Sequence, residues 1–262
     1  MNSLHMTGKT DTGMVRDHNE DCFLIVPESG IAILADGMGG HQAGEVASAM
    51  AIDRVTHYLL NAFAVSHAAK SAAANGASFV SAALVDAIKA ANTAIYDASI
   101  SRPEQSGMGT TIVAAAFHDN TLSVAHVGDS RLYRYRNGVL SQVTEDHSMV
   151  QELLRRGLMT PEEARTSLNR NLVTRALGID PMVEVDVREQ QYEDGDIYLL
   201  CSDGLNDVLT DEEIAAVLAQ HPGNMESAAQ QFITDVNTRG GPDNVSIVLI
   251  RTDGRFSRTP AN

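Results

Sequence analysis

Four aspartates stand where an apolar, strand-like segment is expected to give way to a tight turn: Asp36, Asp129, Asp203 and Asp243. A single aspartate beside a glycine most often forms an Asx turn or a cap. If the four strand ends converge, however, the carboxylates crowd together and cannot all stay ionised without compensation. Divalent cations would provide that compensation. Because the ligands offered are oxygens, the pattern favours Mg²⁺ or Mn²⁺ over Zn²⁺.

Two such cations side by side would support hydrolysis at phosphorus. They would bridge a water molecule, lower its pKa and neutralise the oxygens of a phosphoryl group. Arg16 is a candidate to hold that group, because a guanidinium matches two phosphate oxygens at once. An equally weighted alternative makes Arg16 a surface residue paired with Asp17 or Glu20.

Antiparallel strands are expected to position these residues. Two pairs of strands flank the turn-forming dipeptides Asp119-Asn120 and Asn137-Gly138, and the second is the strongest hairpin signal in the chain. Consecutive hairpins predict antiparallel sheets rather than crossovers. The expected strands are Ile31–Ala35, Thr110–Phe117, Thr121–Val127, Leu132–Arg136, Val139–Val143, Ile197–Cys201 and Val245–Ile250.

Helices are marked by their start signals. Thr160 and Thr210 each stand three residues before a glutamate, which predicts a capping box at the start of a helix. Strands in the middle of the chain with helices entering in pairs define an α+β class, and the lack of a long linker predicts one domain over residues 1–262. The last few residues are expected to form a disordered tail. Further helices are expected after Gly44, within Ser66–Ser99 around a loop near Asn75-Gly76, and from Met225 to about Thr238.

The composition limits the class of protein. A chain of 262 residues with 44% hydrophobic and 20% charged residues has an ordinary globular composition. Its net charge of −15 argues against non-specific binding to nucleic acid or to an anionic membrane. No apolar run is long enough for a membrane span or a signal peptide. Cys22 and Cys201 are expected to be buried free thiols, and the chain a cytoplasmic monomer.

Eight segments resemble the motifs of the 2C-type metal-dependent protein serine/threonine phosphatases of the compact bacterial kind. Each motif is weak alone, but the set follows the family's order along nearly the whole chain and is highly specific. The segments are Gly13–Asp21, Ala35–His41, Gly107–Thr111, Val127–Arg131, Thr144–Ser148, Val173–Gly178, Ser202–Leu205 and Gly241–Ser246.

The resemblance implies a fold, a reaction and partners. The fold would be a β-sandwich of two packed antiparallel sheets flanked on both sides by pairs of helices, with a flap at about residues 147–173. The reaction would be Mg²⁺- or Mn²⁺-dependent hydrolysis of phosphoserine and phosphothreonine on proteins by direct attack of water, without a phosphoenzyme. The partners would be phosphorylated proteins, among them a serine/threonine kinase and its substrates.

The resemblance also assigns ligands to the first metal. Asp36 would bridge the two core ions, and Gly37 would contribute its carbonyl oxygen. Asp203 and Asp243 would complete the coordination of the first ion.

The remaining site residues follow in the same way. Glu20 and Asp21 would serve the second ion, partly through water. Asp129 together with Asp203 would form a third site, and Arg16 would hold the substrate phosphate.

One position departs from part of the family. Met38 stands where some members, notably animal ones, have a histidine proposed to protonate the leaving group. His41 and His147 do not fill that slot, and His41 is more readily explained as packing or capping beside its helix. The general acid is therefore unassigned, with metal-bound water as one candidate donor.

Two other interpretations of the sequence are weaker. The glycines after Asp36 suggest a dinucleotide fold, but the last glycine of that fingerprint would fall at Gln42. The stronger alternative is a phosphoprotein-binding module that kept the fold and lost turnover. It would be expected to have lost metal ligands, whereas Asp36, Asp203 and Asp243 are all present.

Overall fold

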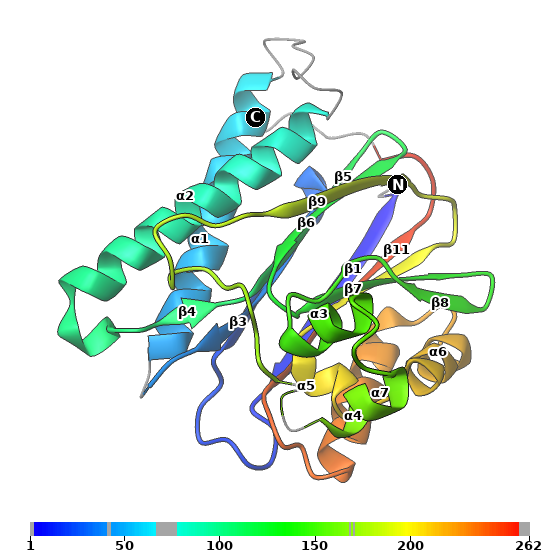
Figure 1. Ribbon diagram of the computed structural model, residues 1–262. Helices are drawn as coiled ribbons and strands as arrows, with labels where there is room; N and C mark the ends of the chain where they lie inside the picture. The colour runs from blue at the N-terminus through cyan, green and yellow to red at the C-terminus, as the bar shows by residue number, and fades with distance from the viewer. Residues whose placement is uncertain (1–2, 41–42, 67–77, 168, 170, 257–262) are drawn as a thin grey trace.

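The computed structural model describes residues 3–40, 43–66, 78–167, 169 and 171–256, and two antiparallel sheets form its centre (Figure 1). The five-stranded sheet has the order β1-β11-β10-β7-β8, and the other has the order β2-β3-β5-β6-β9 with β4 paired to β3. The strands of the first sheet are β1 (Leu4–Asp11), β7 (Arg131–Arg136), β8 (Val139–Gln142), β10 (Ile197–Cys201) and β11 (Val245–Thr252). Those of the second are β2 (Asp21–Val26), β3 (Ile31–Met38), β4 (Gly109–Thr110), β5 (Ile112–His118), β6 (Thr121–Val127) and β9 (Asp186–Gln191).

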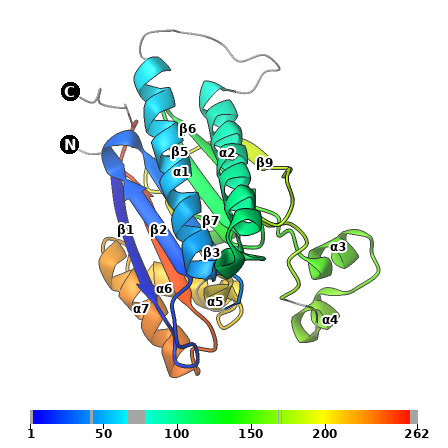
Figure 2. The same ribbon diagram turned by 90° about the vertical axis from the view of Figure 1, so that its left-hand side faces the viewer.

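Pairs of helices cover the outer faces of both sheets. Helices α1 (Ala43–Ser66) and α2 (Phe79–Ser101) lie side by side on the β2–β9 sheet, as Figure 2 shows. Helices α6 (Asp211–Gln220) and α7 (Met225–Thr238) pack on the other sheet. Shorter elements are the 3₁₀ helices η1 (Pro27–Ser29) and η2 (Pro103–Gln105) and the helices α3 (Met149–Arg155), α4 (Pro161–Thr166) and α5 (Asp203–Asn206).

The central strands carry apolar side chains on both faces because both faces are covered. In β3, Ile31 and Ile33 point towards the helices, whereas Leu34 points towards the other sheet. Between the sheets, the ring of Phe117 meets Tyr192 and Tyr198 edge-on at centroid distances of 5.5 and 5.6 Å. The β-sandwich with flanking helix pairs is confirmed.

The local signals are also confirmed. Asn137 and Gly138 have φ angles of 51° and 83°, the left-handed values that a two-residue type I′ hairpin turn requires. Capping boxes form at Thr160 and Thr210, the N-caps of α4 and α6. The helix predicted from Met225 ends at Thr238.

Some expectations were wrong. Strand β3 continues past Ala35 to Met38, because Gly37 and Met38 pair with the short strand β4. Strands β1 and β9, which carry mixed polar sequences, were not expected. Cys201 is a buried free thiol, but Cys22 is only partly buried. The loop expected near Asn75-Gly76 and the expected C-terminal tail lie outside the described residues.

The expected flap, residues 147–173, contains α3 and α4 and stands away from the sandwich on one side (Figure 2). An isolated bridge between Ser148 and Val173 closes its base.

Candidate metal centre

The predicted aspartates gather at one end of the sandwich. Asp21 begins β2 and stands directly opposite Asp36 of β3. Asp129 follows β6, and Asp203 begins α5 directly after β10. The fifth aspartate, Asp243, lies two residues before β11. Strand ends from both sheets therefore converge, as the sequence predicts.

Burial and mutual repulsion dominate the electrostatics of this cluster. Burial, together with the charges of Asp21 and Asp203, holds the pKa of Asp36 well above its ordinary value. Burial and the charge of Asp129 do the same to the pKa of Asp203. Burial also raises the pKa of Asp21 to about 6 and that of Asp129 to about 6. A divalent cation would supply the positive charge that these crowded carboxylates need.

The hydrogen bonds of Asp21 leave one of its two carboxylate oxygens without a donor. Its side chain is buried, and Oδ2 accepts a bond of 2.8 Å from the Ser202 hydroxyl. Its other oxygen, Oδ1, is buried without a hydrogen-bond partner. A buried carboxylate oxygen left without a donor is costly unless something else binds it. Together with an all-oxygen donor set, this orphaned atom fits a hard divalent cation.

The end of β3 is held firmly behind Asp36. The N–H of Asp36 donates to Thr111 Oγ1 at 3.2 Å, and its C=O accepts from the N–H of Thr111 and the hydroxyl of Thr110, both at 2.8 Å. Thr111 Oγ1 also lies 2.7 Å from Ser130 Oγ, one residue after Asp129. The backbone that carries Asp36 is therefore linked to the segment that carries Asp129.

Glu20 lies against the start of α1. Its C=O accepts from the N–H of Gly37 at 3.1 Å and from the Ser48 hydroxyl at 2.6 Å. Its carboxylate accepts from the N–H of Gly44, and burial raises its pKa. A Cβ at Gly44 would lie 2.6 Å from Glu20 Cδ, so a larger residue there would displace the Glu20 carboxylate.

Arg16 lies at the rim of the cluster. Its guanidinium is about half exposed, and Nη2 donates to Asp243 Oδ2 at 2.7 Å. The partner is therefore neither Asp17 nor Glu20, as the surface-residue alternative had it. The exposed edge of the guanidinium is available to an anion.

Asn244 is a site residue whose role the sequence alone does not reveal. Its Oδ1 accepts from the N–H of Glu20 at 2.8 Å, and its Nδ2 donates to the C=O groups of Thr12 and His18, both at 2.9 Å. It thereby holds the loop that carries Arg16 and Glu20 against β11. The one sequence signal for this role is that Asn244 lies in the motif Gly241–Ser246. Its contacts could not be read from the sequence, because its partners lie more than 200 residues away.

The possible proton donors lie apart from the cluster or outside the described residues. His41 is not described. His147 is buried at the base of the flap, where its ring contacts Gly128, and burial lowers its pKa to about 4. Met38 carries no ionisable group.

Comparisons with known proteins identify the family of the chain. The family model described as "Protein phosphatase 2C" matches residues 15–239. A serine/threonine phosphatase stp of Listeria monocytogenes is 39% identical over 253 residues, covering 95% of this chain and 96% of its own. The Mycobacterium tuberculosis protein phosphatase PstP is 40% identical over 246 residues, covering 94% of this chain and 44% of its own.

Solved structures give the same result. The catalytic domain of PstP in complex with two manganese ions has a TM-score of 0.79 at 38% identity, covering 96% of this chain and 99% of that one. The Streptococcus agalactiae serine/threonine phosphatase has a TM-score of 0.83 at 33% identity, covering 95% of this chain and 100% of that one. The chain belongs to the protein phosphatase 2C family, whose chemistry depends on Mg²⁺ or Mn²⁺.

Proposed function

We propose that the protein hydrolyses phosphoserine and phosphothreonine on other proteins. The observation that carries this proposal is the convergence of five aspartates from both sheets beside the exposed guanidinium of Arg16. The names of the relatives, serine/threonine phosphatases of about the same length or with a domain of this length, support the choice of substrate.

The role of each ligand is part of the proposal. Asp36 would be shared by two cations, with the Gly37 carbonyl oxygen, Asp203 and Asp243 completing the first set. The second set would be Glu20 and Asp21, and the third Asp129 with Asp203. The raised pKa values, the close carboxylates and the orphaned Asp21 oxygen support these assignments. Lewis acidity, which lowers the pKa of water and offsets phosphoryl charge, is the chemistry that such ions supply.

The chain itself binds and orients the phosphoryl group. Arg16 would donate to two phosphate oxygens through the edge of its guanidinium that Asp243 leaves free. The described serines at the cluster, Ser130, Ser202 and Ser246, are all buried. Ser202 donates its hydroxyl to Asp21, Ser246 donates to Thr10, and Ser130 shares a hydrogen bond with Thr111, so all three are badly placed to accept a phosphate. This supports direct attack by water, with the serine or threonine oxygen leaving as phosphorus gains the water oxygen.

Turnover on a panel of phosphopeptides tests the proposal. Purified protein with Mn²⁺ should release phosphate from phosphoserine and phosphothreonine peptides, and EDTA should abolish the release. Binding of the peptides without release would favour the non-catalytic module instead. Activity that survives EDTA, or a trapped phosphoenzyme, would contradict the mechanism.

Arg16→Ala is expected to raise KM for phosphopeptides by about tenfold, because a charge-assisted contact to the phosphate is lost. Steady-state kinetics with a phosphothreonine peptide measures this effect. Arg54→Ala, which changes an exposed arginine of α1, is the matched control. An unchanged KM in Arg16→Ala would assign phosphate binding to another group.

We also propose the location, the oligomeric state and the partners of the enzyme. We infer a cytoplasmic monomer in which residues 1–262 form one catalytic domain that opposes a serine/threonine kinase and acts on that kinase or its substrates. The two free thiols suit a reducing compartment, and the net charge of −15 suits neither nucleic acid nor an anionic membrane as partner. Among the described helices, none combines the length and apolar character needed to cross a bilayer.

A further inference from the structure

A second polar cluster lies between Asp129 and the flap. It contains His126 of β6, His147 and Asp186 of β9, whose potential ligand atoms lie within 4.8 Å of one another. The two imidazoles stack, with ring centroids 4.6 Å apart and planes at 17°. His126 Nε2 lies 2.8 Å from the C=O of Glu145, which can only accept, so this nitrogen carries the hydrogen.

The contacts of His147 decide what this cluster can do. The N–H of Gly128 donates to Nδ1 at 3.1 Å. A neutral imidazole that accepts at Nδ1 carries its hydrogen on Nε2. That hydrogen faces Asp186 Oδ1 at 3.5 Å, an oxygen that also accepts from Arg175 Nη1 at 2.8 Å. A burial-lowered pKa of about 4 agrees with a neutral ring.

This tautomer argues against a cation in the cluster. A metal bound at His147 Nε2 would move the ring hydrogen to Nδ1, where it would face the N–H of Gly128. Arg175 Nη1 lies 3.1 Å from the same Nε2, and a guanidinium can only donate, so a neutral ring can accept from either Arg175 or Gly128 but not from both. Arg175 Nη1 has other acceptors, Asp186 Oδ1 at 2.8 Å and the C=O of Glu184 at 3.3 Å. The Gly128 N–H, in contrast, has His147 Nδ1, so Nδ1 is the accepting nitrogen. The positive charge of Arg175 beside Nε2 also disfavours a cation there. The cluster therefore serves to hold the ring in one orientation.

The backbone of His147 also bonds to Gly128, and in addition to Thr174. Its N–H donates to the C=O of Gly128 at 3.0 Å, and its C=O accepts from the N–H of Thr174 at 2.8 Å. Ser148 then pairs with Val173 at the base of the flap. His147 thus binds both polar backbone groups of Gly128. It also joins the start of the flap, where it stands, to Thr174, which directly follows the end of the flap.

Gly128 has little freedom to move if these contacts stay intact. Its φ is +105°, and a Cβ there would lie 2.6 Å from Thr111 Cβ. Thr111 in turn binds the backbone of Asp36. Gly128 is therefore enclosed by Thr111 on one side and by His147 on the other, and the next residue is Asp129.

We propose that His147 is a positioning residue that holds Asp129 in place through the backbone of Gly128. The proposed third cation site, which includes Asp129, is thereby kept in a fixed position relative to the base of the flap. The part that concerns cations rests on the role of Asp129 proposed above. The part that concerns the backbone stands on the contacts alone.

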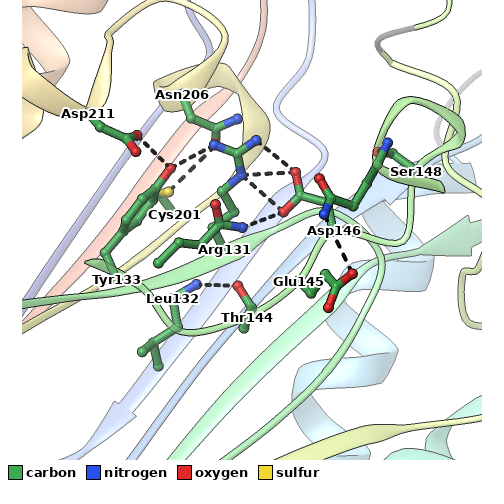
Figure 3. A network of polar contacts seen from close by, with 12 residues as sticks. Arg131, Leu132, Tyr133, Thr144, Glu145, Asp146, Ser148, Cys201, Asn206 and Asp211 are labelled. Atoms are coloured by element: carbon green, nitrogen blue, oxygen red, sulfur yellow. Dashed lines mark hydrogen bonds and ion pairs between the residues drawn. The ribbon is translucent and has the colours of Figure 1, made fainter. Parts of the chain in front are cut away.

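The loop before His147 has an independent anchor, so substitution of His147 is expected to leave the fold intact. Arg131 donates to both oxygens of Asp146 at 2.7–3.0 Å and to the hydroxyl of Tyr133 at 2.7 Å (Figure 3). Tyr133 then donates to Asp211 at the start of α6.

His147→Asn and His147→Gln form a matched pair that tests the proposal. Asparagine places an amide oxygen where Nδ1 stands and can still accept from the N–H of Gly128; glutamine places its amide near Nε2 and leaves that N–H without a partner. In metal-free protein, amide hydrogen exchange in residues 126–131 should be about tenfold faster in His147→Gln and near wild type in His147→Asn.

A Mn²⁺ titration of phosphopeptide hydrolysis gives the second measurement. The Mn²⁺ concentration for half-maximal activity should rise about tenfold in His147→Gln and stay near wild type in His147→Asn. His57→Gln, at an exposed histidine of α1, should change neither measurement.

Equal exchange rates in the two His147 variants would overturn the proposal, since the ring would then matter only for packing. If exchange behaves as expected but neither His147→Gln nor Asp129→Asn changes the Mn²⁺ dependence, the link to a cation is overturned and the proposed role of Asp129 fails with it. The backbone positioning by His147 would be confirmed in that case.

Discussion

Substitution of Asp203 by asparagine is expected to lower kcat/KM for phosphopeptides by at least about 100-fold to 1,000-fold. Asp203, like Asp36, is assigned to two cations, so loss of its carboxylate should weaken two of the proposed sites at once. Its carboxylate feels the charges of Asp129, Asp243 and Asp21, which places it in the middle of the cluster. An amide of the same shape keeps the packing but removes the charge that attracts the ions.

The melting temperature of the same variant separates lost chemistry from lost structure. Metal-free Asp203→Asn should melt no lower than metal-free wild type, because the substitution removes a buried charge that its neighbours repel. Asp97→Asn, at an exposed aspartate of α2, is the matched control and should keep full activity. Activity of Asp203→Asn within tenfold of wild type would contradict its assignment.

Saturating Mn²⁺ is expected to raise the melting temperature by about 5 °C or more. A ligand present at 100 times its Kd stabilises the native state by about 2.7 kcal/mol per site, and in a chain of this size each kcal/mol raises Tm by about 2–4 °C. The physical cause is that cations would offset the burial and the mutual repulsion that together hold the pKa of Asp36 and Asp203 high. Differential scanning calorimetry with and without Mn²⁺ measures the shift.

Asp203→Asn again provides the control for this measurement. Its Tm should respond less to Mn²⁺, because a ligand of the proposed first and third sites is gone. A wild-type Tm that does not change at saturating Mn²⁺ would show that the carboxylates are not crowded enough to need a cation.

Much of the fold could be predicted because its signals are local. The turn at Asn137-Gly138 and the capping boxes at Thr160 and Thr210 depend on residues within a few positions of one another. Strand β9 (Asp186–Gln191) could not be found in this way, since its polar sequence shows neither a buried run nor clear alternation. Its position is decided by pairing with β6, a tertiary contact.

The same distinction between local signals and tertiary contacts applies to the candidate site. Asp36, Asp129 and Asp203 were visible because each follows an apolar run, and Asp243 because it stands just before one. Asp21 came from the family resemblance alone, and the convergence of the strand ends was a hypothesis. The role of Asn244 was not visible, because it depends on contacts to Thr12, His18 and Glu20 across the whole length of the chain. The partner of Arg16 was missed for the same reason: Asp243 is 227 residues away.

The origin of the five aspartates has a mechanical consequence. Asp21 and Asp36 belong to one sheet, whereas Asp203 and Asp243 border the other. An ion held by these side chains would cross-link the two halves of the sandwich, between which Phe117 packs on Tyr198. With such an ion bound, the two sheets could not slide past one another without releasing it, so we expect chelation to loosen the packing of Phe117 against Tyr198 as well.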